Sequence, residues 1–135
     1  LWREKLALLA VPTTGSTAIE EALQPYAAIS YTRPPMVKHM TLTRFNRFMR
    51  PYLDVVGLAE VQTFAIMREP LDWLGSWYRY RQREGLRNTA KSTANLTFDE
   101  FVTAYMTQKN RPDYAEVGSQ ARFLSAGAKG KPIDY

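Results

Sequence analysis

The sequence predicts an α/β fold with a mostly parallel sheet and flanking helices. Two short, almost wholly apolar runs, residues 5–11 and 61–67, are typical of strands buried on both faces. Each run is followed by residues that favour a helix and by a signal for its start. Strands that alternate with helices form parallel pairs with right-handed crossovers, and ligands bind at the carboxyl ends of such strands.

The first strand is predicted over residues 5–11 (KLALLAV), because the apolar run is continuous and ends at a proline. Residues 12–16 (PTTGS) then form a loop of small side chains. Residues 17–23 (TAIEEAL) contain good helix formers with acidic residues in the early turns, and we expect Ser16 or Thr17 to cap this helix. The resulting order is strand, small-residue loop and helix.

The next segments are interrupted by prolines. Residues 27–31 (AAISY) are a candidate strand that Pro34 halts, because proline lacks a backbone donor and restricts the residue before it. Residues 42–49 favour a short basic helix that Pro51 ends or kinks, and residues 52–58 are expected to begin another turn or two.

The second strand of the parallel pair covers residues 61–67 (VQTFAIM), which are rich in β-branched and aromatic side chains. A helix over residues 70–83 follows, because proline is tolerated in a first helical turn. Its apolar stripe is expected to face the sheet and consists of Leu71, Leu74 and Tyr78.

The last third of the chain predicts a loop, two helices and a turn. Residues 84–96 are polar and are expected to form a mobile loop. Thr97 and Glu100 fit a capping box that opens a helix through about residue 106. Residues 119–124 are predicted to be a final helix, and residues 127–132 a turn into a last strand.

Length and composition indicate one folded domain, residues 1–135, because the chain is 45% hydrophobic and 23% charged. The absence of cysteine excludes a disulfide framework, and a single histidine argues against a metal site. No apolar run is long enough for a membrane span or a secretory signal, so we expect a cytoplasmic protein without a membrane partner. The chain begins at Leu1 rather than methionine, so an upstream segment is expected to be missing.

The basic residues are clustered within a net charge of +5. Residues 33–50 carry Arg33, Lys38, Arg44, Arg47 and Arg50 with no acidic residue, and a second cluster lies at residues 79–87. This asymmetry favours an anionic partner such as a nucleotide, a sulfated or acidic sugar, or a nucleic acid. For any single arginine, a solvated helix face is the favoured interpretation.

Two loops at predicted strand ends carry the candidate chemistry. The loop that runs into the first helix offers backbone N–H groups and the positive end of the helix dipole to an anion. The second loop places Arg68 directly after a strand and Ser76 eight residues later on the next helix. A guanidinium fork and a hydroxyl suit a phosphate. A capped helix start and an Arg68 ion pair with Glu69 or Asp72 are the purely structural alternatives.

VPTTGSTAIE (11–20) and FAIMREPLDWLGSWYRYR (64–81) together resemble the sulfotransferase family that uses 3′-phosphoadenosine 5′-phosphosulfate (PAPS). A PKTGST loop and an R-x-P-x-x-x-x-x-S pattern are that family's motifs. KHMTLTRF (38–45), LTFDEFV (96–102) and QARFL (120–124) resemble its carbohydrate-type and small bacterial branch. The resemblance implies a P-loop-like fold, although no Walker A motif is present. The chain ends at Tyr135, shorter than the family usually runs, so later sheet elements are expected to be missing.

The resemblance also implies roles for individual residues. The loop would hold the 5′-phosphosulfate and Arg68 with Ser76 the 3′-phosphate, while PAPS donates its sulfuryl group to a hydroxyl acceptor, for which a carbohydrate is one candidate. His39 aligns with a histidine base and Lys38 is placed to offset phosphate charge, with Glu20 and Glu21 as alternative bases. The loop residues that match or occupy the phosphosulfate motif are Pro12, Thr13, Thr14, Gly15, Ser16 and Thr17.

Thr13 stands where the family motif carries a lysine. Loss of one preorganised donor at a transition state commonly costs about 10²- to 10³-fold in rate. Slow catalysis, replacement of the charge by Lys38 or Lys5, or a non-catalytic nucleotide-, anion- or glycan-binding relative are therefore all open. A third, weaker hypothesis is nucleic-acid binding by the arginine and aromatic residues of 77–87.

Overall fold

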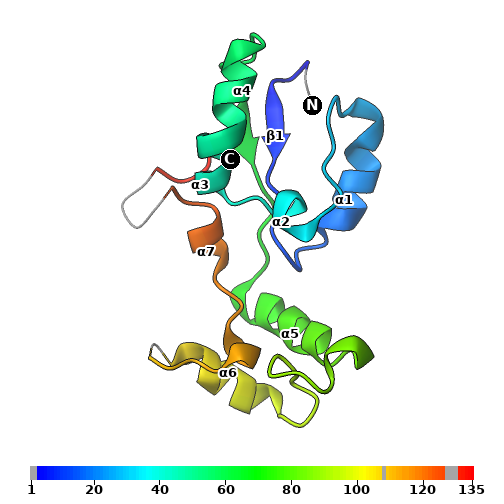
Figure 1. Cartoon of the computed structure of the whole chain (residues 1–135), viewed down its shortest axis with the longest axis vertical. Helices are drawn as coiled ribbons and strands as arrows, with labels where there is room; N and C mark the ends of the chain where they lie inside the picture. The colour runs from blue at the N-terminus through cyan, green and yellow to red at the C-terminus, as the bar shows by residue number, and fades with distance from the viewer. Residues whose placement is uncertain (1–2, 108, 127–130) are drawn as a thin grey trace. The chain divides into compact units, whose positions relative to one another are not determined.

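The computed structural model describes residues 3–107, 109–126 and 131–135. The chain divides into two compact units, Leu1–Met67 with Ser119–Tyr135 as unit 1, and Arg68–Gly118 as unit 2. Figure 1 labels the α-helices and strand β1. Two compact units can belong to one domain, so the single domain predicted from the sequence stays a prediction. Each unit is described by itself below.

Unit 1 contains the parallel pair of strands that the sequence predicts. Strands β1 (Leu6–Leu8) and β2 (Gln62–Phe64) pair in parallel, with Leu6 opposite Gln62 and Leu8 opposite Phe64. The strands are shorter than the apolar runs, although Leu9 N still donates to Phe64 O at 2.9 Å. The α/β class is thus confirmed at the level of a two-stranded parallel sheet with helices.

The helices of unit 1 lie between the two strands in sequence and after residue 119. The predicted helices at 17–23 and 119–124 are confirmed as α1 and α7, which begin at Ser16 and Gln120. The full set is α1 (Ser16–Leu23), the 3₁₀ turn η1 (Gln24–Tyr26), α2 (Pro35–Lys38), α3 (Leu42–Arg44), η2 (Phe45–Met49), α4 (Arg50–Val55) and α7 (Gln120–Phe123).

The candidate strand at residues 27–31 is wrong. These residues follow the turn η1 without strand pairing, and Ile29 and Tyr31 are largely exposed. Residues 27–31 and β1 line a common cavity of about 210 Å³, so the neighbouring edge of β1 is not closed by them. On that edge the carbonyl of Ala10 is bonded instead by the ring of His39.

The sequence predicted that Pro51 ends or kinks the helix, and the first of these alternatives is wrong. Pro51 does not end it, since α3, the π-helical turn η2 and α4 follow one another from Leu42 to Val55. A π turn bonds residues five apart and often marks a local distortion in a helix. Because Pro51 lacks an N–H and crowds the carbonyl four residues before it, the widened turn directly upstream accommodates the proline.

Unit 1 is held together by an apolar core and by hydrogen bonds from the last residues of the chain. The N–H of Tyr135 donates to Thr63 O at 3.1 Å, and Ala65 N donates to Tyr135 O at 3.2 Å. The predicted turn at residues 127–132 lies largely outside the described residues. The buried core residues are Leu9, Val11, Leu42, Phe45, Val61 and Leu124.

Unit 2 consists of helices and turns: α5 (Pro70–Arg81), η3 (Glu84–Leu86), α6 (Phe98–Met106) and η4 (Asp113–Ala115). The helix at 70–83 is confirmed with an earlier end, and its first turn is capped by Glu69, which accepts from Asp72 N at 2.8 Å. The capping box of Thr97 and Glu100 is present. Hydrogen bonds from Thr97 hold the pKa of the Glu100 carboxyl below its ordinary value.

Aromatic side chains dominate the core of unit 2. Phe101 is fully buried, and Trp73 and Leu74 are nearly so. Leu71, predicted to face a sheet, is 58% exposed, because α5 packs against α6 in this unit and Trp73 takes the buried position. Residues 84–96 form a loop that Thr93 anchors by donating from Oγ1 to Tyr78 O at 2.8 Å.

No helix in the described part of the chain combines the length and the apolar character needed to cross a bilayer.

Candidate anion-binding site

The loop after β1 leads into α1 through two residues with left-handed backbone. Thr13 has φ 62° and Gly15, the N-cap residue, has φ 80°. No side chain caps α1 among the described residues, so the predicted Ser16 or Thr17 cap is wrong; both residues lie inside the helix instead. The first N–H groups of a helix lack intrahelical acceptors, and without a cap they remain directed at whatever lies before the helix.

The loop hydroxyls have different roles. Thr14 Oγ1 donates to Val11 O at 2.9 Å, which fastens the loop to the buried residues that follow strand β1. Ser16 is buried at the first position of α1. Thr17 Oγ1 accepts a hydrogen bond from Lys38, so its own hydrogen is available for donation.

Thr13 occupies an unfavourable backbone conformation for its side chain. A β-branched residue at positive φ is a genuine outlier, and such a residue costs on the order of 1–3 kcal/mol. Gly15 reaches the same region without a penalty, and a Cβ built on it meets no atom within 4 Å. The loop therefore has an open approach at Gly15.

Lys38 brings a positive charge to this loop. Its Nζ donates to Thr17 Oγ1 at 2.9 Å and pairs with Glu20 Oε2 at 3.0 Å, with both charged side chains only 15% exposed. An ammonium has three N–H donors, so one is left for a ligand. Lys5, the other candidate for the missing lysine, precedes β1 at its opposite end and pairs with Glu60 at 2.7 Å.

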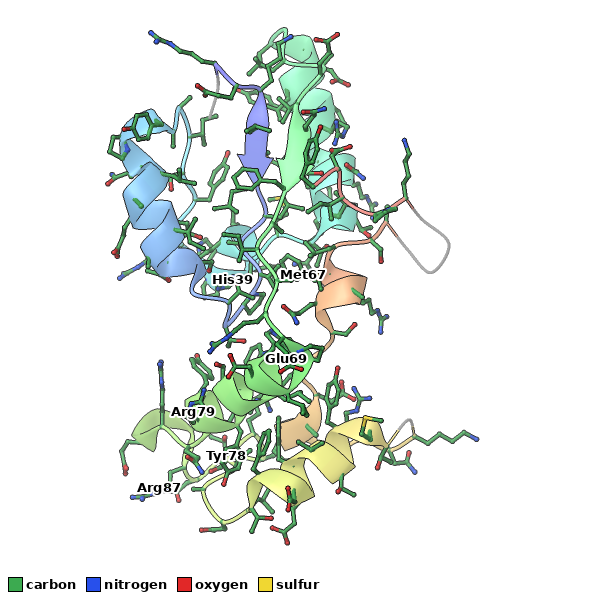
Figure 2. All side chains as sticks on the ribbon, turned by 180° about the vertical axis from the view of Figure 1, so that it is seen from behind. His39, Met67, Glu69, Tyr78, Arg79 and Arg87 are labelled. Carbon is green, nitrogen blue, oxygen red and sulfur yellow. The ribbon has the colours of Figure 1, made fainter. Side chains whose placement is uncertain are left out.

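His39 follows α2 as its C-cap residue and contacts the β1 segment. Its Nδ1 lies 2.7 Å from Ala10 O. Because a carbonyl oxygen only accepts, Nδ1 carries the hydrogen, and the neutral ring keeps its lone pair on Nε2. Figure 2 labels His39 among the side chains of unit 1. A histidine held in one tautomer by its backbone contact has the form that a general base requires.

In unit 2, two arginines converge on one serine. Arg68 Nη1 donates to Ser76 Oγ at 2.6 Å, and Arg79 Nη2 donates to the same oxygen at 3.3 Å. Arg68 also pairs with Asp72 through Nε and Nη2, at 3.1 and 3.0 Å. The structural alternative for Arg68, an ion pair with Asp72, is thus present together with its bond to Ser76.

The structure brings predicted site residues together within each unit. Lys38 bonds Thr17 of the loop at residues 12–17, His39 contacts Ala10 between β1 and that loop, and Arg68 bonds Ser76. Sequence reasoning missed the role of Arg79 and the pairing of Glu20 with Lys38. For Arg79 a signal was available, because it lies one helical turn after Ser76.

The part of the chain that the structure describes contains no group of three or more histidine, aspartate or glutamate side chains suited to a metal ion. Comparisons of the chain with protein-family models, with curated proteins and with solved structures found no match.

Proposed function

We propose that this chain is a sulfotransferase-like protein that binds PAPS and transfers its sulfuryl group to a hydroxyl acceptor. The observation that carries the proposal is the uncapped first turn of α1, which follows a left-handed loop and has the Lys38 ammonium at 2.9 Å from Thr17. The absence of a side-chain cap removes the simplest structural explanation for the small-residue loop. The sulfotransferase resemblance supplies the identity of the ligand.

The loop fits a phosphosulfate group chemically. Backbone N–H groups at the start of α1, the Thr17 hydroxyl and the remaining N–H of Lys38 are all donors, and anions favour such a helix terminus. Gly15 leaves space for a ligand to approach the backbone. In the proposed reaction these donors offset the negative charge that develops on the departing phosphate.

His39 is the proposed base. As the acceptor oxygen attacks sulfur, the bond from sulfur to the 5′-phosphate oxygen breaks and the hydroxyl proton passes to His39 Nε2. The contact from Nδ1 to Ala10 fixes the tautomer that this step needs. Glu20 is a weaker candidate for the base, because its carboxylate is already paired with Lys38.

Unit 2 supplies the second part of the proposal. We assign Arg68 and Ser76 to the 3′-phosphate of the nucleotide. Arg68 is already oriented by Asp72 and Ser76, so little conformational entropy is lost when a phosphate binds. The pairing with Asp72 weakens the net charge of Arg68 and limits how much affinity it adds.

Calorimetry with adenosine 3′,5′-bisphosphate tests the binding half. Removal of a charged hydrogen-bonding group commonly costs a factor of about 10 to 100 in affinity. We expect the intact protein to bind and Arg68→Ala and Ser76→Ala to bind more weakly. The assignment is rejected if the intact protein gives no heat, or if both variants bind the bisphosphate as tightly as the intact protein does.

Sulfate transfer from labelled PAPS tests catalysis separately. His39→Gln should lose transfer while retaining affinity for the bisphosphate, because only the proton acceptor is removed. The pairing of Lys38 with Glu20 favours a second candidate function, a binder of nucleotides or other anions without turnover. Measurable transfer by the unmodified protein excludes that candidate.

A further inference from the structure

Ser76 receives hydrogen bonds from two guanidinium groups, and this arrangement defines what else can bind it. Arg68 Nη1 lies 2.6 Å and Arg79 Nη2 3.3 Å from Ser76 Oγ. A hydroxyl oxygen has two acceptor lone pairs and one hydrogen to donate. With both lone pairs engaged, the remaining capacity of Ser76 is its O–H, which needs an acceptor.

The charge around Ser76 favours an anionic acceptor. Asp72 offsets the charge of Arg68 at 3.0 Å. Arg79 forms no salt bridge with any carboxylate in the described ranges, so its positive charge is not offset by a close partner. Two guanidinium forks and one hydroxyl donor suit a phosphomonoester, whose oxygens can accept from all three side chains.

Gly75 permits the position of Arg79. It is buried in the middle of α5, and a Cβ built on it would lie 3.3 Å from Arg79 Nη1 and 3.9 Å from Arg79 Cζ. The guanidinium therefore folds back over the helix where a side chain would otherwise stand. Glycine costs about 1 kcal/mol relative to alanine inside a helix, so its presence here calls for a local reason.

One member of the cluster, Arg79, lines an open groove of unit 2. Gly75, Arg79 and Asp72 line this groove, whose volume is about 710 Å³, together with Glu69, Leu71, Tyr78 and Phe98. Figure 2 labels Arg79, Glu69 and Tyr78 in this unit. Glu69 and Asp72 also line this groove, and their carboxylates disfavour an anion there, whereas the guanidinium of Arg79 favours one.

We propose that Arg79, seated over Gly75, is a further phosphate-binding residue that acts with Arg68 and Ser76 and determines selectivity for a nucleotide with a 3′-phosphate. This inference rests on the proposed function and adds to it the selectivity between nucleotides with and without that phosphate. Binding of the 5′ side of the nucleotide does not depend on Arg79.

The test compares adenosine 3′,5′-bisphosphate with adenosine 5′-monophosphate by calorimetry. Arg79→Gln should weaken the bisphosphate about 10- to 100-fold and leave the monophosphate unchanged. Gly75→Ala should also weaken the bisphosphate while raising the midpoint of urea unfolding, because alanine favours the helix but displaces the guanidinium. Arg83→Gln is the matched control, since that exposed guanidinium stacks on Tyr80 at 4.5 Å, and it should change neither affinity.

Equal bisphosphate affinity in Arg79→Gln and the intact protein overturns the inference and leaves the proposed function standing. If the intact protein binds neither nucleotide, the proposed function fails, and inorganic phosphate becomes the probe for the cluster itself. Phosphate should then shift the guanidinium NMR signals of Arg68 and Arg79 in the intact protein, and the Arg68 shift should be lost in Arg79→Gln. Signals that do not respond, or an Arg68 shift that persists, overturn the inference.

Discussion

The loop of unit 1 and the arginine cluster of unit 2 are two candidate anion sites that differ in the donors they offer. The loop relies on backbone N–H groups and neutral hydroxyls, and its one ammonium is shared with Glu20 at 3.0 Å. The cluster uses two guanidinium groups around Ser76, of which only Arg68 is paired with Asp72. Under the proposed function, this difference predicts that binding strength comes mainly from unit 2 and that the chemical step depends on the charge available in unit 1.

The largest effect is expected on stability, when a buried core residue that packs against helix α5 of the arginine cluster is truncated. Phe101→Ala should lower the free energy of unfolding by about 3–5 kcal/mol, because it empties a fully buried position that packs against Tyr78 of α5. Urea denaturation measures this loss. Met106→Ala on the same helix is the control, since Met106 is 70% exposed and should change stability by less than about 0.5 kcal/mol. Similar effects of both variants would contradict the packing described for unit 2.

The next effect concerns the charge missing from the loop. Under the proposed function, Thr13→Lys should raise the rate of sulfate transfer by about 10²- to 10³-fold, because it adds a cation beside the departing phosphate. It should not lower stability, since an unbranched side chain tolerates positive φ better than threonine. Thr13→Met has a comparable length without the charge and should not gain activity. A Thr13→Lys protein with unchanged transfer would show that the loop does not lack a cation.

A smaller effect, on nucleotide affinity, is expected to differ between substitutions of Lys38 and of Lys5. Lys38→Met should weaken adenosine 3′,5′-bisphosphate binding about 10-fold, because it removes the ammonium beside Thr17. Lys5→Met is its matched control, as Lys5 pairs with Glu60 at the other end of β1. Calorimetry should find its affinity unchanged. Equal losses in the two variants would indicate a general charge effect rather than a site at the loop.

The smallest effect is expected from the contact between the end of the chain and strand β2, which pairs with the strand before the loop. The carboxylate of Asp134 accepts from Thr63 N at 2.8 Å and from Thr63 Oγ1 at 2.9 Å, and these bonds hold the pKa of Asp134 below its ordinary value. A lowered folded pKa contributes stability above the unfolded pKa, near 4, and this contribution is lost as the pH falls through the folded value.

Asp134→Asn should therefore destabilise the protein by on the order of 1 kcal/mol or less at pH 7, since water screens this exposed carboxylate. Urea midpoints at pH 7 and pH 3 should differ less in the variant than in the intact protein. If the urea midpoint depends equally on pH in both proteins, Asp134 does not cause that dependence.

The sequence predicted the elements whose signals are local. The capping box of Thr97 and Glu100 was correct because cap and helix are three residues apart, and both strands of the parallel pair were located because their apolar runs are continuous. The candidate strand at 27–31 failed because a strand also needs a partner edge, which no local pattern specifies. The prediction that Leu71 is buried was wrong because the apolar stripe of its helix was expected to face a sheet, whereas the helix packs against α6.

The same distinction between local and long-range contacts applies to the candidate site. The motif residues Arg68 and Ser76, which the sequence assigned to one phosphate, are at hydrogen-bonding distance from each other. The contact of Lys38 with Thr17 joins residues 21 positions apart, and that of His39 with Ala10 joins residues 29 positions apart. Tertiary folding determines such contacts, so sequence spacing alone offers no measure of them. The cap at Ser16 or Thr17 failed because Gly15 could adopt the left-handed conformation that starts the helix one residue earlier.

The π turn η2 has a consequence for how changes in the length of residues 42–55 are tolerated. Phe45, Met49 and Leu53 recur every four residues and all pack into the core of unit 1. A regular α-helix has 3.6 residues per turn, so a strict four-residue repeat drifts around its axis, and a wider turn compensates for part of that drift. Deletion of one residue within η2 should therefore rotate Leu53 out of the core, which makes the length of this segment as strictly constrained as its composition.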